Sequence, residues 1–306
     1  MKKTGNQTII FKNPPHIKAY ASTAGKKEAE GPFGKFFDMT TDDVYWGENS
    51  WEKAENKFVK EALERESAWD ILLKKTMLNK QEIGAVLSGD LLNQCVGTSY
   101  GLREFSIPYI GLFGACSTMG LSQKLAAMTI DGGFAKRCMA ITSSHFCSAE
   151  RQFRFPLEDG AQRPPSAQWT VTGAACVILD DEEGDVRIEC ATSGKIIDLG
   201  IKDANNMGAA MAPAAVDTIK THFEDLNRTP DYYDAIFTGD LGSVGKAIVA
   251  DLLSKDGYDL STNYFDCGEL IFTPNQDVHS GGSGCACSGL ILCAHILPKM
   301  ERKSLK

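Results

Sequence analysis

One stretch of the sequence places a cysteine between a strand-like segment and a helix-like segment. It is Gly114-Ala115-Cys116-Ser117-Thr118-Met119-Gly120. The short apolar segment 107–113 precedes it, and a helix-compatible run with apolar residues at helical spacing follows over 121–130. This order predicts a strand, a tight turn and a helix, with Cys116 at the helix N-terminus. Unpaired backbone N–H groups and the helix dipole favour an anion there, so we expect the thiol to lose its proton more easily than usual. The pattern is that of a nucleophile elbow.

The composition excludes several classes of protein. A chain of 306 residues, 43% of them hydrophobic, can bury a large core. Its net charge of −8 and the lack of a basic run argue against binding to nucleic acid. The ten cysteines are scattered, many in apolar segments, as in a reduced cytosolic protein. The start of the chain does not resemble a signal peptide, and no apolar run approaches the roughly 18 residues of a membrane span. We therefore expect a soluble, cytoplasmic protein.

Strands alternate with helices along the chain, which predicts an α/β fold with mostly parallel sheets. Strands are expected at 8–11, 83–87, 137–142, 173–179, 185–192 and 234–238, and helices at 51–77, 91–100, 213–226, 243–253 and 284–296. Residues 21–50 and 146–170 are expected to be long loops. A strand followed by Gly-Asp and a helix occurs twice, at Gly89-Asp90 and at Gly239-Asp240, which indicates an internal duplication.

Four further segments identify a family resemblance, which extends over essentially the whole chain. They are Thr142-Ser143-Ser144-His145, Glu150-Arg151-Gln152-Phe153-Arg154, Gln168-Trp169-Thr170-Val171-Thr172-Gly173, and Gln276-Asp277-Val278-His279-Ser280-Gly281-Gly282-Ser283-Gly284-Cys285. Together with the elbow at Cys116, they resemble the thiolase and ketoacyl-synthase superfamily, and within it the stage V sporulation protein AD family.

The resemblance implies a fold, a ligand and partners. The implied fold is a thiolase-like five-layer αβαβα sandwich of two similar halves, which we place at residues 1–184 and 185–306. The implied function is non-catalytic binding of dipicolinic acid (pyridine-2,6-dicarboxylate), free or as its calcium chelate, for uptake into developing spores and release in germination. A homodimer is expected on the forespore side of the spore inner membrane, associated peripherally with the other stage V sporulation membrane proteins. The family normally continues beyond the last helix, so we expect the second half to be truncated at Lys306.

The alternative is a Cys-dependent acyltransferase or condensing enzyme, in which Cys116 is the nucleophile and His279 its base. A condensing enzyme would usually carry a second catalytic histidine after the second-half strand, and this chain has Asp240 there. A carboxylate cannot replace an imidazole that donates to a carbonyl oxygen, because its charge repels that oxygen. The substitution weakens the condensing-enzyme hypothesis and leaves simple acyl transfer open.

The candidate ligand-binding residues are Cys116, His145, Arg151, Arg154, Asp240, His279, Gly281 and Gly282. Guanidinium groups suit a dicarboxylate, and the alternative for Arg151 and Arg154 is a pair of solvated or ion-paired loop residues. Trp169 and Phe153 could stack on a pyridine ring or pack in the core. Cys285, Cys287, Cys293 and His295 lie in an apolar helix without CxxC spacing, so neither a metal site nor a cofactor is predicted.

Overall fold

The computed structural model describes residues 2–63, 80–153, 157, 160 and 162–305. The largest sheet contains β3 (His16–Ala24), β4 (Met39–Thr40), β5 (Ala85–Gly89), β6 (Tyr109–Gly111), β7 (Arg137–Ser144), β9 (Gly173–Asp180) and β10 (Val186–Arg187). Three smaller sheets consist of β1 (Lys2–Thr4), β2 (Thr8–Ile10) and β11 (Cys190–Thr192); of β12 (Ile236–Thr238) and β13 (Tyr264–Asp266); and of β8 (Trp169–Thr170) and β14 (Gly282–Ser283).

The α-helices are α1 (Lys26–Ala29), α2 (Trp51–Glu61), α4 (Val96–Leu102), α5 (Thr118–Asp131), α6 (Phe146–Phe153), α7 (Met207–Leu226), α8 (Gly242–Lys255), α9 (Cys267–Leu270), α10 (Cys285–Ile291) and α11 (Leu297–Glu301). Short 3-10 turns are η1 (Gly34–Phe36), η2 (Lys80–Glu82), η3 (Asn93–Cys95), η4 (Ala115–Ser117), η6 (Pro230–Tyr232) and η7 (Pro274–Gln276). A π-helical segment, η8 (Leu292–Ile296), joins α10 to α11.

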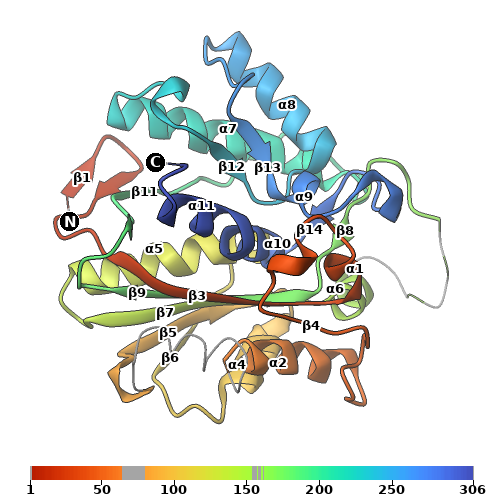
Figure 1. Ribbon diagram of the computed structural model, residues 1–306. Coiled ribbons are helices and arrows are strands. Elements are labelled where there is room, and N and C mark those ends of the chain that lie inside the picture. The colour runs from red at the N-terminus through yellow and green to blue at the C-terminus, as the bar shows by residue number, and fades with distance from the viewer. Residues whose placement is uncertain (1, 64–79, 154–156, 158–159, 161, 306) are drawn as a thin grey trace.

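The elements form five layers, which confirms the expected thiolase-like αβαβα sandwich (Figure 1). Helices α2 and α4 cover one face of the seven-stranded sheet, and α5 and α10 cover the other. Beyond α10 lie β12 and β13, whose far face is covered by α7 and α8. The division into halves at residues 184 and 185 stays a prediction.

The side chains of β9 show how the sheet separates two cores. Ala174, Cys176 and Ile178 point toward α2 and α4, whereas Ala175, Val177 and Leu179 point toward α5 and α10. This alternation follows from the two-residue period of a strand, and every residue of β9 is buried. Helix α10 lies so close to the sheet that a Cβ on Gly289 would come within 2.7 Å of Ala175 Cβ.

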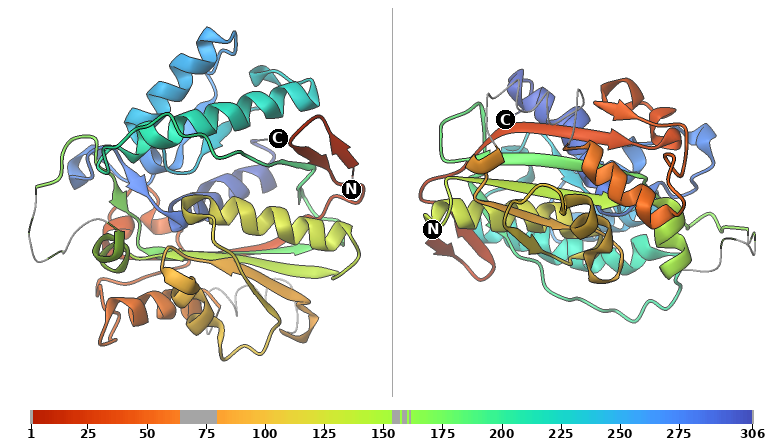
Figure 2. Two further views of the ribbon diagram at one scale, coloured as in Figure 1. Left: turned by 180° about the vertical axis from the view of Figure 1, so that it is seen from behind. Right: turned by 90° about the horizontal axis from the view of Figure 1, so that it is seen from below.

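Several expectations about the elements are corrected. The helix expected at 51–77 ends at Glu61 in its described part, with 64–77 outside the described residues, and the strand expected at 185–192 is two short strands, β10 and β11, in different sheets. The large sheet is mixed, because β9 runs antiparallel to both β3 and β7 (Figure 2). Residues 146–153, expected in a loop, form α6, whose buried Ser148, Ala149 and Glu150 are too small or too polar to show an apolar period. Helix α7 begins at Met207, so Pro213 lies inside it and not in its first turn.

A buried carboxyl group connects α2 to the sheet. The two oxygens of Glu55 accept hydrogen bonds from Ser143 Oγ (3.0 Å) and Ser148 Oγ (2.8 Å). Burial, together with the nearby Asp90 carboxylate, raises the pKa of Glu55 to about 8. Because this pKa is above the unfolded value, the folded protein binds more protons than the unfolded chain between about pH 4.5 and 8.

We therefore predict that the free energy of unfolding falls as the pH rises from 5 to 8, by on the order of 2 kcal/mol through Glu55 alone. Glu55→Gln keeps a partner for both serines and carries no charge, so its stability should depend less on pH. Urea unfolding at several pH values would measure this. Glu48→Gln, at an exposed carboxyl ahead of α2, is the matched control, and equal pH dependence in the Glu55 variant and wild type would contradict the prediction.

Candidate functional site

Cys116 lies on a tight elbow between β6 and α5, as the sequence predicts. The turn is closed by Ser117 Oγ, which donates to the Gly114 carbonyl (2.7 Å), and by Thr118 Oγ1, which donates to the Ala115 carbonyl (2.6 Å). Ala115 has a φ of +46°, a left-handed conformation that an alanine adopts only when its surroundings require it. The thiol is partly exposed and packs against Leu91, Ala149 and Cys285.

Asp240 faces this cysteine from the second half of the chain. One of its oxygens accepts a hydrogen bond from the Gly284 N–H (3.0 Å), and Ser283 Oγ lies 3.4 Å from the same oxygen. Its backbone carbonyl accepts a bond from Gln168 Nε2 (2.6 Å). The Cys116 thiol lies beside the same carboxylate, close enough for each group to shift the pKa of the other. The structure thus brings two of the predicted site residues, Cys116 and Asp240, into contact.

Asp266 holds the turn that carries Asp240, and the sequence analysis missed it. Its carboxylate accepts hydrogen bonds from the N–H groups of Leu241 and Gly242 (both 2.9 Å) and from Thr238 Oγ1 (2.7 Å). It also caps α9 by accepting from the Gly268 N–H. The signal available in the sequence was Asp266 three residues ahead of Glu269, the spacing of a capping residue before a short helix.

The pKa of the Cys116 thiol differs from the value that the sequence predicts. Burial and the Asp240 carboxylate raise the pKa of the Cys116 thiol well above its ordinary value. Burial also raises the pKa of Asp240, to about 6, although Cys116 and the Gly284 N–H oppose the shift. The expected easy loss of the thiol proton is therefore wrong: desolvation and a neighbouring negative charge outweigh the end of α5.

His279 and Gly281 lie in the turn before β14, and Gly282 is the first residue of that strand. Within the described part of the chain, no hydrogen bond joins His279 to Cys116; its Nε2 lies 3.8 Å from Asp277 Oδ1. The Gly281 carbonyl accepts from Trp169 N–H (2.8 Å), and the Gly282 carbonyl accepts from Gln168 Nε2 (2.9 Å). Gly281 has a φ of +117°, and a Cβ there would come within 2.7 Å of the Gly268 carbonyl oxygen. These glycines thus shape the turn through contacts with the protein itself.

The remaining candidates lie elsewhere. Arg151, on α6, forms an ion pair with Glu52 and lies over the Trp51 ring, 4.9 Å from its centroid. Arg154 lies outside the described residues. His145 is buried at the end of β7, where its Nε2 bonds to the Val44 carbonyl (2.8 Å) and its Nδ1 accepts from the Cys147 N–H (3.2 Å). Burial lowers the pKa of His145, so the ring is neutral.

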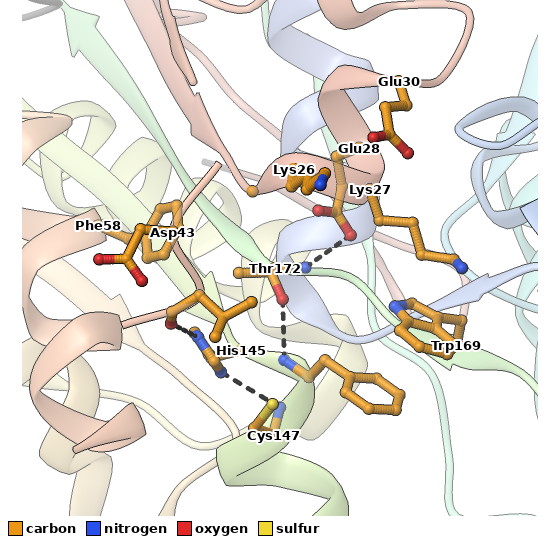
Figure 3. Close-up of a pocket in the computed structure, with 13 residues that line it drawn as sticks. Lys26, Lys27, Glu28, Glu30, Asp43, Phe58, His145, Cys147, Trp169 and Thr172 are labelled. Atoms are coloured by element: carbon orange, nitrogen blue, oxygen red, sulfur yellow. Dashed lines mark hydrogen bonds between the residues drawn. The ribbon is translucent and has the colours of Figure 1, made fainter. Parts of the chain in front are cut away.

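His145 lines a pocket of about 270 Å³ that does not include Cys116 (Figure 3). Its lining residues are Gly25, Lys26, Lys27, Glu28, Glu30, Asp43, Val44, Phe58, His145, Phe146, Cys147, Trp169 and Thr172. The Phe146 ring stacks on Trp169 (centroids 3.8 Å apart, planes 9° apart), and Lys27 Nζ lies 4.1 Å from the Trp169 centroid. The Arg163 guanidinium also lies over this ring, 5.1 Å from its centroid, so the indole already has three neighbours that compete with a ligand ring.

The part of the chain that the structure describes contains neither a cluster of metal ligands nor a membrane-spanning helix. Among the residues that the structure describes, no three His, Cys, Asp or Glu side chains come together as a metal site. Within the same residues, no helix has both the length and the apolar character needed to cross a bilayer.

The contact between Cys116 and Asp240 leads to a prediction about thiol reactivity. In Asp240→Asn the side-chain oxygen still accepts from Gly284, but the negative charge is gone, so the pKa of Cys116 should fall. We expect iodoacetamide to alkylate Cys116 roughly fivefold faster at pH 8 in the variant than in wild type. Mass spectrometry of the labelled peptides measures the rate.

Cys147 and Cys190 serve as internal controls for this measurement. Both thiols are partly exposed, and neither has Asp240 among the charges that affect its pKa. Their rates should not change between the two proteins. An unchanged rate at Cys116 would show that the carboxylate does not control the thiol.

Comparison with known proteins places this site in a family. The profile of the stage V sporulation protein AD family matches residues 5–306. Stage V sporulation protein AD of Bacillus subtilis (strain 168) is 48% identical over 305 residues, which cover 100% of this chain and 88% of that protein. This likeness extends through the Cys116 elbow and the Asp240 turn.

Solved structures agree on the fold at much lower identity. A variant of Xanthomonas campestris OleA with cerulenin has a TM-score of 0.59 at 12% identity, covering 97% of this chain and 91% of that one. The 3-oxoacyl-[acyl-carrier-protein] synthase III of Aquifex aeolicus has a TM-score of 0.56 at 9% identity, covering 95% and 92%. Likeness at this level shows the thiolase-like fold alone. The family match and the identity to the Bacillus subtilis protein together show that the chain belongs to the stage V sporulation protein AD family, and with it to the proteins of sporulation.

Proposed function

We propose that this protein binds dipicolinic acid without chemical turnover, for its uptake into developing spores and its release in germination. The proposal that the protein is not catalytic rests on the position of the Asp240 carboxylate beside the Cys116 thiol. An acyltransferase needs the thiolate, and the Asp240 charge and burial keep the thiol protonated. Among the described residues no hydrogen bond joins a histidine to Cys116, so the imidazole base that the acyltransferase alternative requires does not contact the thiol.

The charges at Cys116 favour one form of the ligand. The N-terminus of α5, a helix of 14 residues, favours a carboxylate beside Cys116. The Asp240 carboxylate repels a free dianion but favours a cation, and calcium prefers carboxylate oxygens. A calcium chelate of dipicolinate carries both a carboxylate for the end of α5 and a cation for Asp240. We therefore propose the chelate as the bound form, at the elbow between Cys116 and Asp240.

Calorimetric titration tests this proposal. Wild type should bind dipicolinate with calcium present and more weakly with a chelator present. Asp240→Asn should weaken binding of the chelate by about tenfold, since it removes one charged contact. Arg151→Ala is the control, because Arg151 is paired with Glu52 away from the elbow, and its affinity should equal that of wild type.

The acyltransferase alternative predicts a different result. The thiolase-like fold and the retained elbow favour it, and an acyl-enzyme on Cys116 would appear as a stoichiometric burst with acyl-CoA. We expect no burst in wild type. A burst that disappears in Cys116→Ala would overturn the binding proposal, and the lack of any dipicolinate affinity would overturn it independently.

We also propose a homodimer, formed at the open edge of the seven-stranded sheet. Among the residues that the structure describes, strand β6 pairs only with β5, and its three residues are exposed, as is Phe113 beyond them. An unpaired strand edge with exposed apolar side chains favours pairing with a second chain. The same proposal places the dimer on the forespore side of the spore inner membrane, held there by the stage V membrane proteins.

A charge at this edge should separate the subunits. Ile110 is 47% exposed, and Ile110→Asp would place a carboxylate in the proposed interface. Sedimentation velocity should show a dimer for wild type and a monomer for this variant. Tyr232→Asp, at an exposed residue of the second half, should stay dimeric. A monomeric wild type, or a dimer unaffected by Ile110→Asp, would rule out this interface.

A further inference from the structure

The pocket beside His145 is separate from the elbow at Cys116. It lies at the end of the seven-stranded sheet, between α1, the start of α6 and Phe58 of α2. Helix α2 covers the face of the sheet opposite to α5, and neither Cys116 nor Asp240 lines the pocket. A ligand here would therefore not contact the proposed dipicolinate site.

Glu28 is the one acidic side chain buried in this pocket. It is 1% exposed, and its Oε1 accepts a hydrogen bond from the Thr172 N–H (3.0 Å). Figure 3 shows its other oxygen directed away from Thr172, and this oxygen lies beside Gly25, where a Cβ would come within 2.9 Å of it. Within the described residues, no Lys, Arg or His forms an ion pair with it. Burial raises its pKa to about 7, although the Thr172 N–H and the charge of Lys27 oppose the shift. A buried carboxylate without a cation is costly, and a ligand that supplies the cation would remove that cost.

The other charged groups of the pocket have partners or lie at its rim. Lys27 lies over the Trp169 ring, and Lys26 and Glu30 are exposed. The two oxygens of Asp43 accept hydrogen bonds from the N–H groups of Tyr45 (3.0 Å) and Gly47 (2.7 Å). With His145 neutral, two lysines and three carboxylates line the pocket, a formal net charge of −1.

The walls are mainly apolar. Phe58, Val44 and Phe146 are among the apolar residues that line the pocket. The volume of about 270 Å³ is at the small end for ligand pockets. These walls favour a small apolar body, and the net charge favours a cation.

We propose that this pocket binds a small apolar molecule that carries a primary ammonium group. The ammonium donates to Glu28, and the apolar body lies against Phe58, Val44 and Phe146. An ammonium has three donors and no acceptor, which suits a carboxylate whose one oxygen already accepts from the backbone. A carboxylate ligand is disfavoured here by the Glu28 charge, so the proposal is independent of dipicolinate binding.

Three probes of similar shape test the proposal on the wild-type protein. Benzylamine, benzyl alcohol and benzoate differ in the charge of one group, and their binding can be compared by ligand-observed NMR and calorimetry. Benzylamine should bind about tenfold more tightly than benzyl alcohol, and benzoate most weakly. Benzoate binding as tightly as benzylamine, or displacement of benzylamine by dipicolinate, would overturn the proposal.

A matched pair of variants then assigns the contact. Glu28→Gln keeps an oxygen for the Thr172 N–H and removes the charge, so benzylamine affinity should fall by about tenfold. Glu30→Gln, at the exposed rim, should bind within about twofold of wild type. Thermal unfolding and dipicolinate titration of both variants check that the fold and the Cys116 site are intact. Unchanged benzylamine affinity in a folded Glu28→Gln would also overturn the proposal.

Discussion

One buried hydrogen bond, from the Gly284 N–H to the Asp240 carboxylate, determines what Cys116 faces. It joins the turn before α8 to the start of α10, and α10 packs against the elbow through Cys285. Gly284 has a φ of +97°, and a Cβ there would come within 2.9 Å of Ser144 Oγ, so only glycine fits. If the donor were lost, the carboxylate would be left buried and unsatisfied, which costs about 1–3 kcal/mol or more for a charged group. The bond thus holds a negative charge beside a thiol.

Because of that charge, Cys116 has the backbone geometry of a nucleophile elbow without the lowered thiol pKa of a nucleophile. The strand, turn and helix around Cys116 are those of the thiolase-like fold, and the end of α5 alone would favour a thiolate. The Asp240 carboxylate carries a full negative charge, whereas a helix end carries about half a positive charge, and burial strengthens the effect of the carboxylate. A protonated thiol is a weak nucleophile but an adequate wall for a ligand. The chain thus combines membership of the stage V sporulation protein AD family with a fold that it shares with 3-oxoacyl-[acyl-carrier-protein] synthase III, and fold alone does not decide between the two proposed functions.

The sequence predicts the fold well where apolar residues dominate and poorly where small or polar ones do. The structure confirms the strands around Val86, Ile141 and Val177 and the helix after Cys116. In these segments apolar residues dominate, so their pattern could be recognised in the sequence. Strand β3 was missed: its inner half is Ala21, Ser22, Thr23 and Ala24, small residues that allow the close packing of α10 but give no hydrophobic signal. Contacts between residues far apart in the sequence were harder still to predict. The pairing of Cys116 with Asp240, and of Arg151 with Glu52, depends on how α8, α10 and α2 pack, which no local pattern contains.

The two proposed sites share one strand, and this explains how they can differ in charge yet lie close in the fold. At the end of β7, successive side chains point to opposite faces of the sheet. Ser143 Oγ donates to Glu55 on α2, whereas Ser144 Oγ donates to the Val171 carbonyl and accepts from the Ala286 N–H at the start of α10. His145 then turns into the apolar pocket, where both ring nitrogens are already bonded. Because each of these groups is fixed by its own partners, β7 separates the site proposed for a chelated cation from the site proposed for an ammonium group.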